Sequence, residues 1–484
     1  MKKNVKDYSK RRRALALLAG VFGLLYITVI VYHTYKPLPE GIAYEGGMHN
    51  LDNIEFLYDL SFAQDQEGTG LEHELVIFEE VYSMIEQADD FIVLDFFLFN
   101  SYISEDKDFP EIAQTLTERL VAKKEEDPDF PIYFITDRLN TGYDSYLTDE
   151  LEQLEDAGVE MVYTELDPLR DSTPLYSGLY RIFFQWFAND GRTWLPNGIA
   201  EDAPDMSLPS YLELANIKAN HRKVIISDGE ALVTSANPHN ESGFHNNMAF
   251  KVSGPIINDM LEAEEAVSLY SGGPEFPRVE EGEEEGPYQA QYLTEGAIFK
   301  ALLEDIANTQ EGDRIWLAMF YLSERDVVNE LIDAANRGVE VRMILDPNEN
   351  AFGNEKTGLP NRPVVHEMRN DSDENQMEIR WYNTTFEQFH AKTIMIESDD
   401  EMIISAGATN FTDRALNNYN LENNLRILAP LDSELAGEVN DYFNRLWDNE
   451  DALYTLHADE YQNTMNFFQR GIYGFQTIFK LTTY

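Results

Sequence analysis

The chain has 484 residues, of which 36 are Lys or Arg and 88 are Asp or Glu, so its formal net charge is −52. Hydrophobic residues make up 43% of it, which is enough for a large core and excludes a wholly disordered chain. The absence of cysteine excludes a disulfide scaffold, a thiol nucleophile and a thiolate-bound metal, and the acidic excess argues against a partner held mainly by phosphate contacts.

The N-terminus joins a basic segment to an apolar one. Residues 1–13 contain seven Lys or Arg, and the nineteen residues 14–32 are uncharged. As a helix, this uncharged run would span roughly 28 Å, close to the thickness of a bilayer core. A cleaved signal peptide is the alternative, but residues 31–34 lack a small-x-small cleavage pattern. We expect an uncleaved transmembrane anchor at 14–33, with the basic tail 1–13 in the cytoplasm and the body outside, because basic flanks stay inside.

The body contains one plan twice. In each copy an apolar run of strand length precedes a helical stretch and a second apolar run that ends in Asp. These segments are residues 91–99, 112–124 and 131–137 in the first copy, and 314–321, 324–336 and 339–346 in the second. This succession predicts βαβ units, and two such units predict mixed or parallel sheets covered by helices, an α/β fold.

Charge and the repeat together suggest the domain boundaries. An acidic, Gly-punctuated stretch at residues 280–286 predicts an exposed linker between the two copies. We expect a first lobe at 45–275 with an aromatic insert at 167–216, an acidic linker at 276–288, a second lobe at 289–450 and a helical C-terminal tail at 451–484.

Each copy then carries a histidine and a lysine two positions apart, followed by an apolar run and an acid. The residues are His221, Lys223 and Asp228 in the first copy, and His390, Lys392 and Glu397 in the second. The spacing of two places the imidazole and the ammonium group on the same face of a strand, directed into one pocket. A single such motif would more often be a plain buried strand, but its recurrence after each βαβ unit indicates a paired site.

A short polar cluster follows each of these strands. It contains Ser235 and Asn237 in the first copy and Asn410 in the second. The two motifs together resemble those of the phospholipase D superfamily, in which H-x-K-x4-D followed by G-S-x-N occurs twice in one bilobal chain. The resemblance covers most of the chain from about residue 51 to 447. It implies two α/β lobes related by pseudo-twofold symmetry, an active site between them without a metal or other cofactor, and a phosphohistidine intermediate.

The resemblance also implies roles for these residues. His221 would attack the phosphorus of a phosphodiester and His390 would act as acid and base, although the reverse assignment stays open because the lobes are near-symmetric. The residue types fit this chemistry, because a negatively charged phosphodiester needs fixed cations and donors around its oxygens. Lys223 and Lys392 would supply the cations, and Asn237 and Asn410 the amide donors.

The sequence departs from the family pattern at three positions. Glu397 stands where the family has Asp, Ala408 where it has Ser, and Thr234 where it has Gly, while Ser235 is retained. The second copy has therefore lost a hydroxyl donor.

Family members place an acid after the motif, where it holds the catalytic imidazole through its other nitrogen. Glu422 fits this position in the second copy, and aligning the next strands places Asn247 opposite it in the first. A carboxylate stabilises an imidazolium better than an amide does. We therefore expect the two histidines to differ in basicity, with His390 the more readily protonated.

The composition of the insert helps to predict the class of substrate. Aromatic and aliphatic residues cover nearly the whole circumference of residues 176–187, which fits either a core helix or a ledge in the bilayer interface. A membrane-anchored phosphodiesterase would most economically act on phospholipid headgroups, because the anchor raises the local concentration of lipid. The expected partners are a phospholipid, the membrane, and water or an alcohol as acceptor, as in a phospholipase D or a cardiolipin synthase. Nucleic acid is not expected; an exported nuclease and a non-catalytic scaffold are the alternatives.

Overall fold

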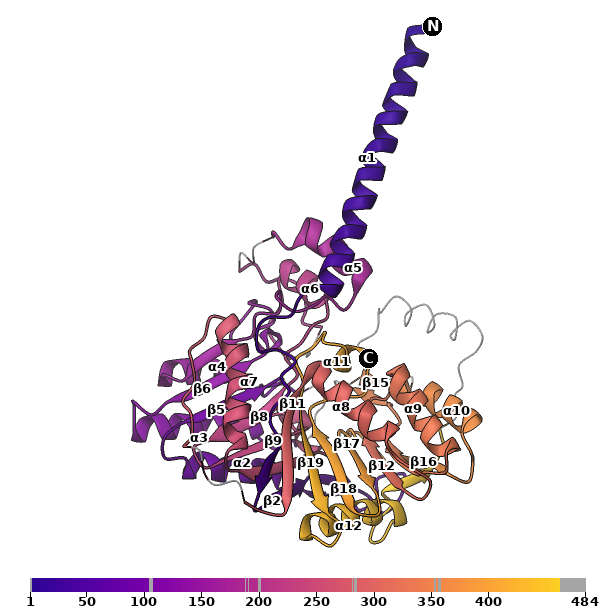
Figure 1. Cartoon of the computed structure of the whole chain (residues 1–484). Coiled ribbons are helices and arrows are strands. Elements are labelled where there is room, and N and C mark those ends of the chain that lie inside the picture. Colours follow the sequence, from indigo (N-terminus) through magenta and orange to yellow (C-terminus); the bar gives the residue numbers. More distant parts are fainter. Residues whose placement is uncertain are drawn as a thin grey trace.

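The computed structural model describes residues 2–461 except 104–107, 188, 190, 199–201, 281, 283–284, 352–353 and 356–357. One long helix, α1 (Lys2–Tyr35), projects from the body (Figure 1). Its large apolar side chains from Leu15 to Val31 are mostly exposed. Among the described residues, Lys10–Tyr35 is the one stretch long and apolar enough to cross a membrane. Helix α1 is therefore a candidate membrane span and lies outside the core of the body.

The first lobe is built on a seven-stranded sheet with the order β2-β10-β9-β8-β5-β6-β7. Its strands are β2 (Ile54–Tyr58), β5 (Ile92–Phe96), β6 (Ile132–Thr136), β7 (Glu160–Tyr163), β8 (Lys223–Ser227), β9 (Glu230–Thr234) and β10 (Met248–Ser253). The main helices are α2 (Ile77–Gln87), α3 (Ile112–Glu126), α4 (Asp149–Ala157) and α7 (Ile256–Tyr270). The small hairpin of β3 (Leu60–Phe62) and β4 (Glu72–Glu74) stands apart from this sheet.

The second lobe is built on a nine-stranded sheet with the order β1-β11-β19-β18-β17-β12-β13-β16-β20. Its strands are β1 (His49–Leu51), β11 (Tyr288–Thr294), β12 (Arg314–Met319), β13 (Glu340–Leu345), β16 (Met377–Tyr382), β17 (Lys392–Glu397), β18 (Glu401–Gly407), β19 (Asn423–Pro430) and β20 (Thr455–His457). Its helices are α8 (Glu295–Ala307), α9 (Arg325–Asn336), α10 (Asn361–Asp371), α11 (Asp413–Leu416) and α12 (Glu434–Asp448).

The two sheets repeat one topology, which confirms the expected pair of α/β lobes. Strand β5 pairs in parallel with β6 and antiparallel with β8, and β12 pairs in the same way with β13 and β17. In both lobes the antiparallel partner is the strand that begins with the motif lysine. The repeat in the sequence is therefore a repeat of strand order.

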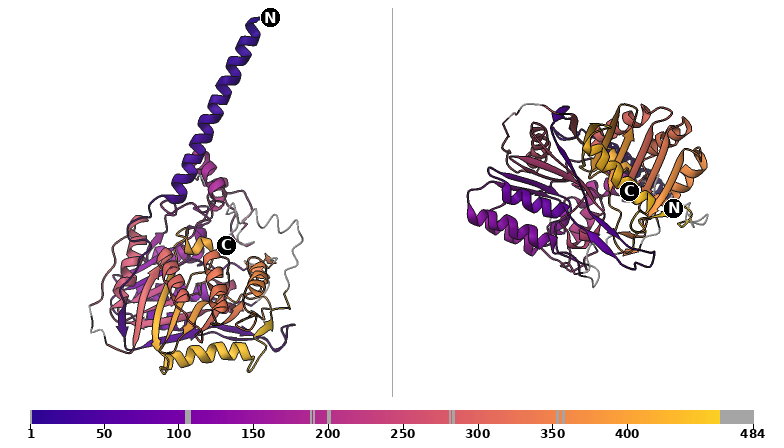
Figure 2. Two further views of the ribbon diagram at one scale, coloured as in Figure 1. Left: turned by 45° about the vertical axis from the view of Figure 1, so that its right-hand side comes forward. Right: turned by 90° about the horizontal axis from the view of Figure 1, so that it is seen from below.

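The lobes share one core and do not form separate bodies. Phe56 of β2 and Tyr442 of α12 pack edge to face, with ring centroids 5.6 Å apart, and a single cluster of buried apolar residues includes Phe250 of β10 and Trp316 of β12. Helix α12 lies across the end of the body opposite α1 (Figure 2). A shared core fixes the two lobes relative to each other, as a site assembled from both lobes requires.

Three details differ from the expected boundaries. Strand β1 lies within the range expected for the first lobe, yet it extends the sheet of the second lobe through β11. Strand β20 lies at the start of the expected helical tail and pairs with β16; residues 462–484 lie outside the described residues. In the expected linker, Phe276 is buried against Tyr133.

The aromatic insert contains α5 (Pro174–Leu179), a π-helical turn η2 (Tyr180–Phe184) and α6 (Leu208–Leu214). It lies at the base of α1 (Figure 1). Trp186 keeps 74% of its surface exposed and Phe183 keeps 48%. The insert is therefore not a core helix, the first of the two alternatives that its composition allowed.

Candidate active site

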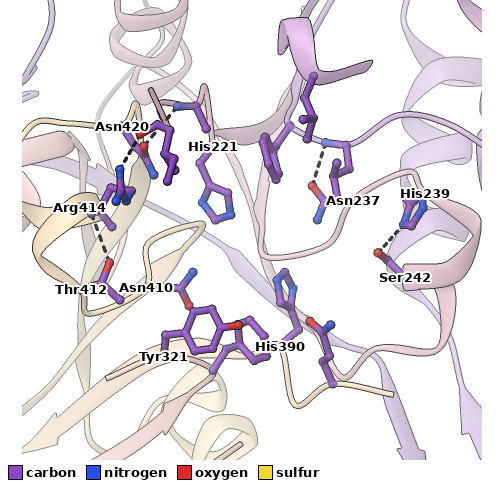
Figure 3. A pocket seen from close by; sticks show the side chains of 18 of the residues that line it. His221, Asn237, His239, Ser242, Tyr321, His390, Asn410, Thr412, Arg414 and Asn420 are labelled. Carbon is purple, nitrogen blue, oxygen red and sulfur yellow. Dashed lines mark hydrogen bonds between the residues drawn. The ribbon is translucent and has the colours of Figure 1, made fainter. Parts of the chain in front are cut away.

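The two motif strands begin at one cavity of about 600 Å³. His221 and His390 precede β8 and β17, and both line this cavity together with Asn237 and Asn410 (Figure 3). Glu422 is a further lining residue. The structure therefore brings five of the residues expected at the site together, although they come from segments up to about 200 positions apart in the sequence.

Each histidine is oriented by a residue of the other lobe. The backbone N–H of His221 donates to the carbonyl of Leu421 at 2.9 Å, which places the next residue, Glu422, beside the imidazole. Nδ1 of His221 lies 2.8 Å from Oε2 of Glu422. In the counterpart, Nδ1 of His390 lies 3.0 Å from Oδ1 of Asn247. The acceptors are oxygens, so both Nδ1 atoms carry a proton and both Nε2 atoms remain for chemistry.

This crossing removes the premise on which the expected order of basicity was based. Burial lowers the pKa of both imidazoles well below its usual value, and Lys223 and Lys392 lower it further. The carboxylate that favours an imidazolium stands beside His221, whereas His390 has only an amide. The premise of the expectation that His390 is the more readily protonated is therefore wrong, because each orienting group serves the histidine of the other lobe.

The two lysines lie behind the histidines and do not themselves line the cavity. Nζ of Lys223 donates to the carbonyl of His221, and Nζ of Lys392 to that of His390, both at 2.8 Å. Each ammonium group also lies 5.2–5.3 Å from an aromatic centroid, of Phe97 and Phe320 respectively. Burial lowers the pKa of Lys223 to about 7 and that of Lys392 well below its usual value. An anion in the cavity would favour the charged form of both.

Two buried aspartates fix the starts of the motif strands. Oδ2 of Asp137 accepts the backbone N–H of Asn220, and Oδ2 of Asp346 accepts that of Phe389, both at 2.7 Å. Burial raises the pKa of Asp137 to about 6 and that of Asp346 to about 7. In the sequence, both aspartates end a predicted strand at equivalent places in the two copies. This repetition could have indicated that they hold the motif strands, a role that was not predicted.

Asp228 and Glu397 require a correction. Asp228 follows the far end of β8 and Glu397 is the last residue of β17, each about 16 Å along the strand from its lysine at about 3.3 Å per residue. Oδ1 of Asp228 accepts the backbone N–H groups of residues 89 and 90 at 3.0 and 3.1 Å, and Oε2 of Glu397 lies 3.5 Å from Nη1 of Arg314. Neither lines the cavity, so their place is structural and not catalytic.

The three polar residues after the motifs have two different roles. Oγ of Ser235 donates to Oδ1 of Asn247 at 3.1 Å, so this hydroxyl supports the group that orients His390. Oδ1 of Asn237 accepts the backbone N–H of Leu98 at 3.3 Å, which fixes the amide at the cavity wall (Figure 3). Oδ1 of Asn410 is buried without a hydrogen-bond partner among the described residues. The two asparagines are therefore the amides placed to meet a bound group.

Further polar residues reach the cavity that the sequence did not single out. His245 lies with its ring centroid 5.7 Å from that of His390, and burial lowers its pKa to about 3, so it stays neutral. Lys218 and Arg414 also line the cavity. Arg414 donates to Oγ of Ser172 and to the carbonyl of Ile217 at 2.5 Å. Its side chain is buried, so these contacts are made inside the cavity wall.

Comparisons with known proteins point to one family. Residues 302–447, within the second lobe, match the family model described as "Cardiolipin synthase, PLD-like domain". A phosphatidylserine synthase from Haemophilus influenzae Rd KW20 shares the fold, with a TM-score of 0.57 and 12% identity over 90% of this chain and 95% of that one. No curated protein matches the sequence significantly.

Two further solved structures resemble the chain more weakly. A polyphosphate kinase from Porphyromonas gingivalis has a TM-score of 0.42 and 12% identity, over 89% of this chain and 56% of that one. Nuc from Salmonella typhimurium, a phospholipase D family member, has a TM-score of 0.26 and 18% identity, over 33% of this chain and 95% of that one.

Proposed function

Because the chain belongs to the phospholipase D superfamily, we propose that it is a membrane-anchored enzyme that breaks the headgroup phosphodiester of phospholipids and transfers the phosphatidyl group to water or to an alcohol. One observation carries the proposal: two imidazoles from two lobes line one cavity, each held through Nδ1, with a buried lysine behind each. Helix α1 would be the anchor, with the basic N-terminal tail in the cytoplasm and the body outside.

In the first step, Nε2 of His221 attacks the phosphorus. A P–N bond forms, and the P–O bond to the departing headgroup alcohol breaks. The leaving oxygen takes a proton from Nε2 of His390. Glu422 stabilises the positive charge that the phosphorylated ring of His221 acquires, which supports His221 as nucleophile. The phosphate charge favours the protonated, acidic form of His390 before the step.

In the second step, His390 returns to its basic role. Its neutral Nε2 takes a proton from water or from an alcohol, whose oxygen attacks the phosphorus as the P–N bond breaks. The buried charges of Lys223 and Lys392 and the amides of Asn237 and Asn410 stabilise the equatorial oxygens in both steps. Water as acceptor gives hydrolysis, and an alcohol gives transfer.

The cavity wall supports a lipid as the substrate. Apolar side chains make up much of it, including Leu139, Leu214 and Ile217. One of these, Leu214 of α6, lies in the insert at the base of α1, the candidate anchor. A phospholipid offers an anionic phosphodiester for the histidines and an apolar glycerol ester region for this wall.

The crossed orienting groups predict opposite pH effects. Attack requires neutral His221, so activity falls as pH drops through its pKa. Glu422→Gln removes the charge that favours the imidazolium, lowers this pKa, and is expected to move the acidic limb of the kcat/KM profile to lower pH. Asn247→Asp adds a charge beside His390, raises its pKa, and is expected to move the basic limb, where His390 loses its proton, to higher pH. Unmoved limbs in both variants would contradict the crossed arrangement.

The test of the proposed function uses the full chain in vesicles of phosphatidylglycerol and phosphatidylethanolamine, with EDTA, with and without added glycerol. Products are identified by mass spectrometry beside His221→Ala and His390→Ala. Headgroup release or cardiolipin formation that both variants lose is the expected result, and the product separates hydrolase from transferase. Cleavage of single-stranded DNA without any lipid turnover would make the protein a nuclease, and no turnover of either substrate would favour a scaffold.

A further inference from the structure

The insert is packed along the C-terminal half of α1. The Tyr26 hydroxyl donates to the carbonyl of Leu175 at 2.5 Å, and the rings of Phe22 and Phe183 lie 5.9 Å apart. Gly178 permits this close approach, because a Cβ there would lie 2.6 Å from a carbon of Ile30. Helix α5 and turn η2 therefore lie beside the candidate membrane span itself and not only beside its end.

The position of these contacts along α1 shows how deep the insert would lie in a bilayer. Phe22 precedes His33, where the uncharged run has ended, by eleven residues. At about 1.5 Å per residue this is roughly 16 Å, about half of a hydrocarbon core of roughly 30 Å. If α1 spans the bilayer, its partner Phe183 reaches near the middle of the membrane, and α5 lies within the outer leaflet.

The exposed side chains of the insert suit that environment. They are large and apolar, and we call them the leaflet face: Leu175, Leu179, Phe183, Trp186 and Phe187, with 38%, 38%, 48%, 74% and 59% of their surface exposed. Arg181 is the single charged residue between positions 174 and 187 of the sequence. It turns inward, where its guanidinium lies 2.7 Å from Asp167 and 2.8 Å from Asp171. A charge that is paired on the protein side leaves an apolar surface for lipid.

The opposite side of the insert faces the cavity. The Tyr176 hydroxyl of α5 donates to the carbonyl of Leu212 in α6 at 2.5 Å, and Oγ1 of Thr173 donates to the carbonyl of Asn216 at 3.0 Å. These bonds join α5 to the segment whose Leu214 and Ile217 line the cavity. One compact unit therefore carries the leaflet face on one side and part of the cavity wall on the other.

We propose that the leaflet face is inserted into the outer leaflet of the bilayer and that a phospholipid enters the cavity sideways along the insert. Its phosphodiester reaches the histidines while its acyl chains stay in the leaflet against α5 and η2. The position of the leaflet face needs only that α1 spans a membrane. The identity of the entering molecule rests on the proposed function.

The first experiment measures depth in the full chain, reconstituted in phosphatidylglycerol and phosphatidylethanolamine vesicles. The sequence has no cysteine, so Phe183→Cys and Trp186→Cys each accept one environment-sensitive fluorophore. Val76→Cys is the matched control. Val76 is an exposed apolar residue, 42% exposed, and it lies two residues from Glu74, which pairs with Arg445 of α12 at the end opposite α1.

Lipids that carry a quencher in their acyl chains are expected to quench the labels at 183 and 186 and to leave the label at 76 unchanged. Labels at 183 and 186 that are as water-exposed as the control would overturn the proposal. So would labels shielded from water but insensitive to the lipid quencher, because another part of this chain or a partner protein would then cover the face.

The second experiment tests sideways entry. It compares turnover of long-chain phospholipid in vesicles with turnover of a short-chain, water-soluble phospholipid. The double variant Phe183→Gln, Trp186→Gln is expected to lower the ratio of the two rates by about tenfold, while Val76→Gln leaves it unchanged. An unchanged ratio in the double variant would overturn sideways entry. If the unaltered protein turns over neither lipid, the proposed function fails, while the depth measurement still decides where the face lies.

Discussion

Replacing His221 by Ala is expected to lower kcat/KM for phospholipid hydrolysis or transfer by roughly 10⁴- to 10⁶-fold, the scale of losing a covalent nucleophile that acts as part of a unit. In the proposed mechanism the other groups at the cavity stabilise charge or move protons, so none of them replaces the lost nucleophile. The measurement is steady-state turnover of vesicle phospholipid by the full chain, with products quantified by mass spectrometry.

The control for this variant is Glu422→Gln, which keeps the imidazole and removes the charge beside it. We expect it to retain measurable activity, about 10- to 100-fold below the unaltered protein. Circular dichroism of both variants shows whether the fold is intact. A folded His221→Ala protein with less than a tenfold loss would contradict His221 as the nucleophile and favour the reverse assignment.

Replacing His390 by Ala is expected to lower turnover of natural phospholipids by roughly 10²- to 10⁴-fold, because the headgroup alkoxide then leaves without a proton. The loss should depend on the leaving group. With a phosphatidyl ester of p-nitrophenol, whose anion leaves unaided, release of p-nitrophenol in the first turnover is expected to slow by less than about tenfold. Stopped-flow absorbance measures this burst.

The His221→Ala variant is the matched comparison, since it should show no burst with either substrate. Equal losses on natural and activated substrates in His390→Ala would contradict its role as acid. A burst in His221→Ala and none in His390→Ala would exchange the two roles.

The sequence predicted the fold from patterns that are local. Apolar runs that end in Asp137 and Asp346 marked equivalent strands, and the spacing of two between His and Lys placed both on one strand face. Both inferences depend on the periodicity of a single strand and on its repetition. The exchange of β1 into the sheet of the second lobe left no such local signal, because the pairing partner of a short edge strand is set by tertiary packing.

The sequence predicted which residues form the site, but not which of them contact each other. Glu422 and Asn247 were found by alignment of the two copies, but the alignment pairs each with its own lobe. The structure crosses them, because backbone bonds such as that from His221 to Leu421 tie each motif to the other lobe. Asp228 belongs to the motif in sequence, yet an extended strand carries it away from the cavity.

The insert shows a different limit. Apolar side chains around the whole circumference suit a helix buried in a core and equally a helix in lipid, since both environments are apolar on every side. Its position against Tyr26 and Phe22 of α1 separates the two cases, and this contact joins segments about 150 positions apart.

The covalent intermediate tests the central claim most directly. His390→Ala protein is mixed with the phosphatidyl ester of p-nitrophenol, quenched in alkali, where phosphohistidine is stable, and digested for peptide mass spectrometry. In this variant p-nitrophenolate leaves without an acid, but removal of the phosphohistidine still needs His390 as the base. The covalent intermediate should therefore accumulate. We expect one phosphatidyl group per chain, on the peptide that contains His221. Steady turnover without any adduct on His221 would contradict the proposed mechanism.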